Sequence, residues 1–379
     1  MQSLVCRIQS AEFEIAYSFM PRSGEAQSSA DTYTDPEENL GGMLHAMGWQ
    51  SVLRSGQRKR TLRWRLSWPL GIVLSIPCIF FAPQGVAMAN AQPSPTLDAG
   101  LLNIRTLISG GKYSNAEGAL HEYLVQKPDS PEAHTLLAFV LFHEAKAQAS
   151  LDEYTKSARL RTPTADDLRI VALDYVLLND YEDASKWMAQ SLAWKGSDPE
   201  SWYEMGRIKY TQNRFQESIE CFQKSLQLLP RSVKAENNLG LALEGLNRND
   251  DAIAAYRQAI AWQENSDNPS EQPLINLAIV LVNRDQLAEA LPLLVRAQVL
   301  APKETKVHEQ LGRLYLKQEQ LDKARAEMET AVELSPGTAG LHFQLGQIYK
   351  RLGLTDKARA EFAKVGQLSG GHSSPDPKE

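Results

Sequence analysis

Hydrophobic and polar positions repeat with a fixed period from Leu97 to near the carboxyl end of the chain. In successive frames of 34 residues, apolar side chains recur at positions 4, 7, 8 and 11 and again at positions 17, 20, 24 and 27. Each set lies along one side of an α-helix, so every frame predicts two amphipathic helices. The frames, interrupted once by Asp267 to Ser270, are 97–130, 131–164, 165–198, 199–232, 233–266, 271–304, 305–338 and 339–372.

Three positions in these frames hold residues of characteristic size. Position 8 holds Ile104, Ala138, Ala172, Gly206, Gly240, Ala278, Gly312 and Gly346. Position 20 holds Ala116, Ser150, Ala184, Ser218, Ala252, Ala290, Ala324 and Ala358, and position 24 holds Leu120, Tyr154, Met188, Phe222, Tyr256, Leu294, Met328 and Phe362. Small residues at positions 8 and 20 let two helix backbones approach, and the large residue at position 24 fills the space beside them.

One such helical pair cannot bury its apolar side alone, so each pair must stack on its neighbours. A proline near the end of most frames, such as Pro230 or Pro302, prevents the second helix from continuing. The pattern therefore predicts an all-α fold of about eight stacked helical hairpins over residues 97–372.

Residues 199–232 carry a pattern that resembles the tetratricopeptide repeat. The matching residues are Trp202, Met205, Gly206, Tyr210, Phe215, Ser218, Phe222, Ser225 and Pro230. The resemblance covers about residues 97–372, is strong from Pro199 onward, and is weakest in 97–130. It implies a right-handed α-solenoid that binds a protein or peptide in the concave groove made by the first helices, where positions 2, 5, 6, 9, 12 and 13 would face the ligand.

The segment before the repeats has the order of a secretory signal. Residues 1–65 show no sustained period and are predicted to be a disordered extension that ends in a basic run. Within residues 66–91, the uncharged run 66–82 is followed by the small-residue sequence Ala89-Asn90-Ala91. Basic, apolar and small residues in this order predict cleavage and export.

We therefore expect an exported, bacterial-type protein in the periplasm, whose mature chain begins near Asn90 or Gln92. Residues 92–96 would be a linker and 373–379 a disordered tail. Retention of 66–82 as a membrane anchor is the alternative, although this run is short for a span. Met43 and Met47 are alternatives to Met1 as the true start.

Charge and motifs argue against several functional classes. The net charge of −6 disfavours a nucleic-acid-binding protein, which needs a basic face. The three cysteines, Cys6, Cys78 and Cys221, are too few for a disulfide framework or a four-cysteine zinc site. No catalytic or cofactor-binding motif occurs, so we predict no enzyme and no cofactor.

Three histidines occupy position 4 of their frames, where Trp202 stands in the frame that begins at Pro199. They are His134, His308 and His342. We interpret them as residues of the repeat core. Because we expect no cysteine or carboxylate column beside them, we predict no metal site.

The predicted groove contains an amide column and several cations and aromatic residues. Position 6 holds Asn238, Asn276, Gln310 and Gln344, whose amides could both donate to and accept from a peptide backbone. The other candidate groove residues are Arg207, Tyr203, Arg313, Lys317, Phe343 and Arg351. This mixture favours an extended segment with acidic residues or a free carboxyl terminus.

We therefore predict a non-enzymatic binding scaffold or adaptor that acts outside the cytoplasm. It would take a protein or peptide ligand, no nucleic acid, and a membrane only through an uncleaved signal segment. Two alternatives remain open. One is a structural, oligomerising subunit of an envelope or secretion assembly, which should expose an apolar end or edge. The other is a regulatory arm of a separately encoded enzyme.

Overall fold

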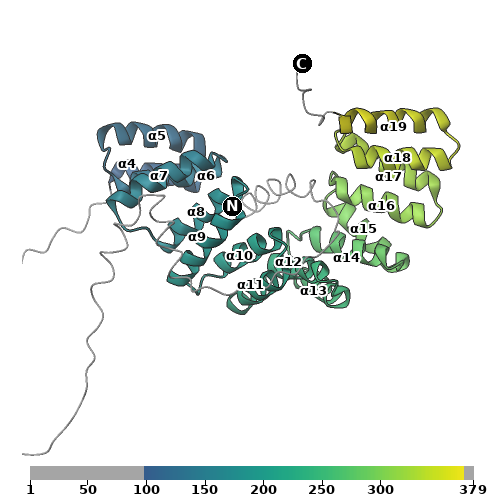
Figure 1. Ribbon diagram of the computed structural model, residues 1–379, viewed down its shortest axis with the longest axis horizontal. Coiled ribbons are helices and arrows are strands. Elements are labelled where there is room, and N and C mark those ends of the chain that lie inside the picture. Colours follow the sequence, from purple (N-terminus) through teal and green to yellow (C-terminus); the bar gives the residue numbers. More distant parts are fainter. Residues whose placement is uncertain (1–97, 371–379) are drawn as a thin grey trace, which may run out of the picture. The chain divides into compact units, whose positions relative to one another are not determined.

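A computed structural model describes residues 98–370 of the chain (Figure 1). The signal segment predicted within 66–91, the extension 1–65, the linker 92–96 and the tail 373–379 lie outside the described residues. The described chain divides into two compact units, which we call the N-terminal unit (98–194) and the C-terminal unit (195–370).

Both units consist of antiparallel helical hairpins. The N-terminal unit contains α4 (Ala99–Ser109), α5 (Tyr113–Gln126), α6 (Pro131–His143), α7 (Ala147–Leu160), α8 (Ala165–Leu177) and α9 (Tyr181–Trp194). The C-terminal unit contains α10 (Pro199–Thr211), α11 (Phe215–Leu228), α12 (Val233–Gly245), α13 (Asn249–Trp262), α14 (Gln272–Asn283), α15 (Leu287–Leu300), α16 (Thr305–Lys317), α17 (Leu321–Leu334), α18 (Ala339–Arg351) and α19 (Thr355–Gly370). Within residues 98–370 these are sixteen helices and no strand, which confirms the predicted all-α solenoid fold.

Local sequence sets where the helices begin. The Ser130 hydroxyl accepts a hydrogen bond from the Ala133 N–H at the start of α6, and Pro131 occupies its first turn. At the start of α8, Thr164 and Asp167 form a reciprocal capping box. These side chains satisfy backbone N–H groups that have no partner inside the helix, and proline at the first position has no N–H to satisfy.

Each hairpin turns through one residue with a left-handed backbone, always at position 15 of its frame. These residues are Gly111, Ala145, Asn179, Asn213, Asn247, Asp285, Glu319 and Gly353. The next N–H then reaches back to the end of the first helix, as from Lys146 to the Leu141 carbonyl at 2.9 Å. This bond ends the first helix and directs the chain into the second.

The small residues at positions 8 and 20 and the large residue at position 24 meet inside each hairpin. Tyr256 on α13 is fully buried, and a Cβ added to Gly240 on α12 would lie 2.4 Å from its ring. Ser218 on α11 donates a hydrogen bond of 2.8 Å to the Gly206 carbonyl on α10. Position 8 therefore faces both position 20 and position 24 of the same hairpin, which explains why it is Gly or Ala in seven of the eight frames.

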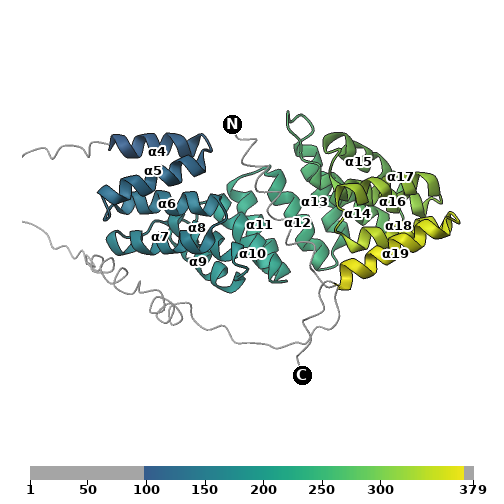
Figure 2. The same ribbon diagram turned by 90° about the horizontal axis from the view of Figure 1, so that it is seen from above.

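Hairpins stack on one another within each unit, as Figure 2 shows for α4 to α7 and for α16 to α19. In the C-terminal unit one buried cluster runs from Phe222 on α11 through Leu274 on α14 to Leu311 on α16. In the N-terminal unit a cluster joins Leu101 on α4 with Leu137 on α6. Stacking therefore buries the apolar side that each hairpin leaves open.

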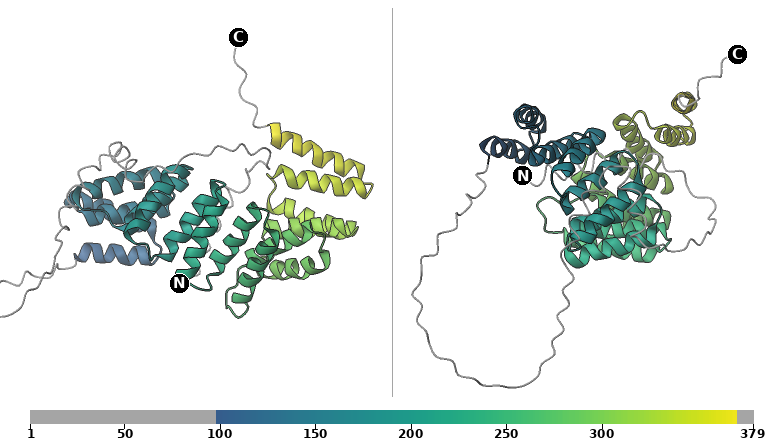
Figure 3. Two further views of the ribbon diagram at one scale, coloured as in Figure 1. Left: turned by 60° about the horizontal axis from the view of Figure 1, so that its bottom comes forward. Right: turned by 60° about the vertical axis from the view of Figure 1, so that its left-hand side comes forward.

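The four-residue insertion lies between α13 and α14 and is held by one side chain. The Gln263 amide is buried, accepts from the Ser270 N–H at 2.8 Å, and donates to the Ser270 carbonyl at 2.6 Å. After this loop the 34-residue spacing resumes, and helical hairpins continue to the yellow end of the described chain (Figure 3). Among the helices of residues 98–370, none combines the length and apolar composition needed to cross a bilayer.

Candidate functional site

Amide side chains connect successive first helices in the C-terminal unit. Asn238 on α12 donates to the Tyr203 hydroxyl on α10 at 2.9 Å. Asn276 on α14 donates to Oδ1 of Asn237 on α12 at the same distance. We call these four residues, Tyr203, Asn237, Asn238 and Asn276, the amide row. It comprises three residues predicted for the groove and one, Asn237, that was not among the predicted binding residues.

The amide row keeps hydrogen-bonding capacity after these contacts. An Asn side chain has two donors and an oxygen acceptor, and Asn276 uses one donor. Its Oδ1 has no partner within the described residues, and both Asn238 and Asn276 are partly exposed. Leu241 and Ile279, partly buried aliphatic residues at position 9, follow three residues after them on the same helices. Amide donors and acceptors thus lie beside an apolar surface.

Two cations cover the ring of Tyr203. The Lys234 ammonium lies 4.4 Å from the ring centroid and the Arg207 guanidinium 5.7 Å from it. Both cations also contact carboxylates, because Lys234 binds Glu200 at 2.7 Å and Arg207 binds Glu204 at 3.0 Å. Tyr203 is only 9% exposed, so its ring is largely occupied by its own neighbours.

Arg313 lies in a different electrostatic environment. Its guanidinium donates to Oε1 of Gln310 at 3.4 Å, and within the described residues it has no carboxylate partner. Gln310 is 1% exposed, and its Nε2 has no acceptor in this part of the chain. The partly buried Arg313 therefore carries a positive charge that the unit leaves uncompensated nearby.

The remaining predicted binding residues belong to other local contacts. Lys317 binds Asp285 at 3.2 Å, and Arg351 binds Glu319, so each cation pairs with the turn residue of the preceding hairpin. Gln344 donates to Glu309 at 3.3 Å. Phe343 is 48% exposed, and its ring lies 5.9 Å from that of Phe362, at the last hairpin. None of these hydrogen bonds, ion pairs or ring contacts involves a residue of the amide row.

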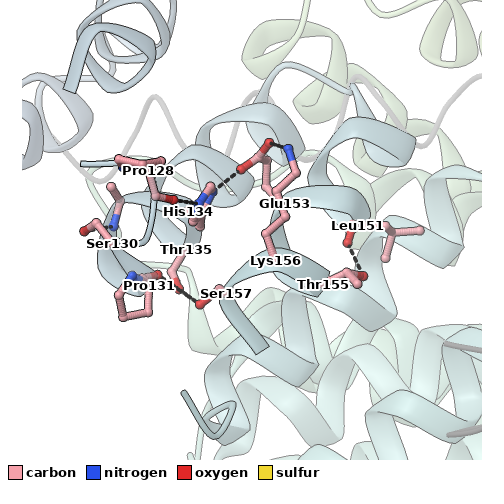
Figure 4. Close-up of polar contacts among 11 residues, drawn as sticks. Pro128, Ser130, Pro131, His134, Thr135, Leu151, Glu153, Thr155, Lys156 and Ser157 are labelled. Atoms are coloured by element: carbon pink, nitrogen blue, oxygen red, sulfur yellow. Dashed lines mark hydrogen bonds and ion pairs between the residues drawn. The ribbon is translucent and has the colours of Figure 1, made fainter. Parts of the chain in front are cut away.

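The three position-4 histidines form identical polar contacts. Figure 4 shows the His134 example, in which Nε2 donates to the Pro128 carbonyl at 2.8 Å and Nδ1 lies 2.6 Å from Glu153. The same geometry joins His308 to Pro302 and Glu327, and His342 to Pro336 and Glu361. Each imidazole, on the first helix of a hairpin, thus links the second helix of that hairpin to the loop that precedes it.

These contacts correct the expectation that no carboxylate column accompanies the histidines. A glutamate follows each of them by 19 residues, at position 23, and the sequence contains this signal. Trp202 takes the corresponding place by donating to the Gly196 carbonyl at 2.9 Å, and Cys221 stands at its position 23. Among residues 98–370, no three histidine, cysteine or acidic side chains gather closely enough to hold a metal ion.

Cys221 is buried in its hairpin. It is 7% exposed, and burial raises the pKa of its thiol to about 12. A thiol with so high a pKa carries almost no thiolate at neutral pH, and thiolate is the reactive form. The geometry thus gives Cys221 a packing role.

The stacked hairpins and the connected first helices define a helical repeat protein. Sequence comparison matches tetratricopeptide repeat families over residues 203–269, 282–353 and 339–369. The chain is a tetratricopeptide repeat protein, as the sequence pattern predicted.

Known proteins with this repeat resemble parts of the chain. The peroxisomal targeting signal receptor of Kluyveromyces lactis is 26% identical over 156 residues, which are 40% of this chain and 27% of the receptor. The tetratricopeptide repeat-containing protein trd-1 of Caenorhabditis elegans is 24% identical over 170 residues, or 44% of this chain and 21% of trd-1. The matches therefore span about a quarter of the length of these curated relatives.

Solved structures resemble the fold at lower identity. A tetratricopeptide repeat protein from Parabacteroides merdae has a TM-score of 0.54 and 16% identity, covering 66% of this chain and 97% of its own. Yeast Tom70 has a TM-score of 0.53 and 17% identity, covering 75% of this chain and 63% of its own. At these identities the likeness concerns the fold.

Proposed function

We propose that the chain is a non-enzymatic scaffold that binds an extended protein segment on the first-helix face of its C-terminal unit. The amide row carries this proposal. The partly exposed Asn238 and Asn276 each bridge helices with one donor. Each keeps a second donor, and Asn276 also keeps its Oδ1, for a peptide backbone, which presents alternating N–H and C=O groups. The relative named as a receptor for a targeting signal supports recognition of a peptide.

Arg313 supports an acidic ligand group near the amide row. A guanidinium without a carboxylate partner gains from a charge-assisted hydrogen bond to an incoming carboxylate. The aliphatic residues Leu241 and Ile279, which follow the two asparagines by three residues on the same helices, favour an apolar ligand side chain beside the amides. The ligand class is therefore an extended segment that combines an aliphatic residue with a nearby carboxylate.

A displayed library of linear peptides, selected on the full chain, tests this proposal. Selected peptides should share an aliphatic and an acidic position, and Asn238→Ala with Asn276→Ala should weaken their binding about tenfold or more. Each amide also bridges two helices, so helix content and thermal stability must be measured in parallel. Gln223→Ala with Gln258→Ala, which removes two exposed amides from the second helices α11 and α13, is the matched control.

The control pair should bind as the parent does. If the Asn238/Asn276 variant remains folded and binds selected peptides as tightly as the parent, the amide row serves only to join helices. If no linear peptide is enriched over background, the first-helix face does not recognise extended segments. Either result would reject the proposal.

For location, we propose export through the signal segment within 66–91, with the binding unit on the periplasmic side. The order of basic, apolar and small residues supports this. Amino-terminal sequencing of the protein from a bacterial envelope fraction should find a start near Asn90 or Gln92. Recovery of chains that retain 66–82 would instead indicate an anchor, and recovery from the cytoplasm would reject export.

The last hairpin favours a second function, self-association as an assembly subunit. Phe362 at position 24 is only partly buried, whereas the equivalent Tyr256 is fully buried, and Phe343 beside it is 48% exposed. The exposed Phe343, with the partly buried Phe362 beside it, forms an aromatic surface that association would cover. Light scattering should then detect an oligomer that Phe343→Ser disrupts, and a monomeric parent protein would exclude this function.

A further inference from the structure

Asp174 on α8 occupies a position that six of the other seven hairpins fill with a buried apolar residue. It is position 10 of its frame, where the other buried residues are Val140, Ile208, Ala242, Val280, Leu314 and Ile348. Asp174 is likewise fully buried, at 0% exposure. Its Oδ2 lies 2.6 Å from the hydroxyl oxygen of Ser150 on α7, and its Oδ1 has no hydrogen-bond partner in the described residues. A carboxyl group is thus enclosed by a core that is otherwise apolar.

Hydrogen-bond counting indicates which oxygen supplies the proton. The Ser150 oxygen lies 2.9 Å from the Ala138 carbonyl, which can only accept, so the single hydroxyl hydrogen is used there. The equivalent Ser218 donates the same hydrogen bond to the Gly206 carbonyl, and within the described residues this hydroxyl has no hydrogen bond with a carboxyl group. The 2.6 Å contact between Ser150 and Asp174 therefore needs a second hydrogen, which a protonated carboxyl supplies.

Among the described residues, no cation acts directly on Asp174 to stabilise a carboxylate, although Arg161 and Arg169 act on Tyr154. In the described part of the chain, the contact shared with Ser150 is the one side-chain hydrogen bond of Asp174. The ionisable groups coupled to it are Tyr154 on α7 and Tyr175 on α8, and both phenols have raised pKa values, to which Asp174 contributes. On α6, the neutral Ala138 carbonyl accepts the hydrogen bond of Ser150, the hydroxyl partner of Asp174. On α9, Asp183 acts on Tyr175 as a further negative charge.

We propose that Asp174 is a neutral carboxylic acid in the folded N-terminal unit and that it makes the packing of α8 on the α6–α7 hairpin sensitive to pH. Loss of its proton would place a carboxylate in the core with one oxygen unpartnered and no cation to compensate it. Burying an unpaired charge is strongly unfavourable, so the hairpins would separate more readily. The device is independent of the amide row, which belongs to the other unit.

The direction of the pH effect follows from the two protonation equilibria. Burial raises the pKa of Asp174 to about 8 in the folded unit, against 3.8 for an ordinary aspartate. Between these values the folded unit holds a proton that the opened chain releases, so stability falls as the pH rises. The stabilisation is complete below about pH 4 and lost by about pH 8, and opening becomes about tenfold more favourable per pH unit between them.

Hydrogen exchange of the full chain tests the proposal locally. Backbone amides of α7 and α8, corrected for the intrinsic pH dependence of exchange, should show an opening equilibrium that rises about a hundredfold from pH 5 to pH 7. Asp174→Asn keeps the shape of the side chain without an ionisable group and should abolish this rise. Asp152→Asn, which changes an exposed aspartate on α7, should leave it intact.

A second measurement reports the protonation state of the Asp174 carboxyl group directly. In protein labelled with ¹³C at aspartate carboxyl groups, the resonance lost in the Asp174→Asn variant should remain that of a neutral acid at pH 6, where exposed aspartates are ionised. If that resonance titrates near pH 4 with the others, the proposal is wrong. A parental opening equilibrium that does not change from pH 5 to pH 7 would also overturn it. Asp174→Val, which copies Val140 and Val280, gives an independent pH-insensitive reference if the asparagine variant does not fold.

Discussion

Replacement of Gly240 by alanine should destabilise the C-terminal unit, although alanine is the better helix former. In a helix interior this exchange ordinarily contributes about 1 kcal/mol of stability. At Gly240, however, the new methyl would lie 2.4 Å from Cε1 and 2.8 Å from Cδ1 of Tyr256. That ring is fully buried, and its hydroxyl donates to Glu244, so it has little room to move. Overpacking typically costs about 1–3 kcal/mol, which gives a net loss of up to about 2 kcal/mol.

Gly366→Ala provides the matched control, because a Cβ at this α19 position would meet nothing within 4 Å. We expect it to stabilise by up to about 1 kcal/mol. Thermal unfolding would measure both variants, together with hydrogen exchange of α12 and α13 for Gly240→Ala and of α19 for Gly366→Ala. Combining Gly240→Ala with Tyr256→Leu copies the Ala278 and Leu294 pair of the next hairpin, and the two changes should show a favourable coupling. If Gly240→Ala stabilises as much as Gly366→Ala, position 8 does not contact position 24 as described.

Three further predictions concern the repeat core. Ala324→Trp should cost about 1–3 kcal/mol or more by thermal unfolding, because Ala324 is fully buried; unchanged stability would contradict its placement. His342→Phe should lower the free energy of unfolding by about 1–3 kcal/mol, because the Pro336 carbonyl and Glu361 lose their hydrogen-bond partner. His121→Phe, at an exposed histidine, should change it by less than about 0.5 kcal/mol. Equal effects of the two changes would argue against the histidine contact. Cys221, with a pKa of about 12, should react with a thiol reagent at pH 8 only after denaturation, and rapid labelling of the native protein would show that it is accessible.

The fold could be predicted from the sequence because repetition supplies its own evidence. One glycine beside one tyrosine says little, but small residues at position 8 and large ones at position 24 recur in hairpin after hairpin. The same physical cause, close approach of two helices, acts at Gly206 with Phe222 and at Gly240 with Tyr256. Periodicity thus identified both helices of each hairpin before any contact was known.

The hydrogen-bond partner of a side chain was much harder to predict than the helix face on which the side chain lies. Asn238 and Asn276 share position 6, yet one donates to a tyrosine and the other to an asparagine of the preceding first helix. Gln310 at the same position is buried. A column establishes which face of a helix a residue lies on. The partner depends on side-chain length and on what the neighbouring hairpin presents, and these differ from one repeat to the next.

The ion-pair partners of the groove cations were equally hard to predict from the columns. These partners change which ligand the first-helix face favours. The sequence analysis placed four cations, Arg207, Arg313, Lys317 and Arg351, in the predicted groove. In the structure Glu204, Asp285 and Glu319 neutralise three of them, and two of these carboxylates come from turn residues that no groove column includes. Because paired charges attract a further anion weakly, the attraction for an acidic ligand concentrates at Arg313. A bound segment is therefore expected to need one carboxylate placed near that residue, whereas acidic residues elsewhere along it should add little to affinity.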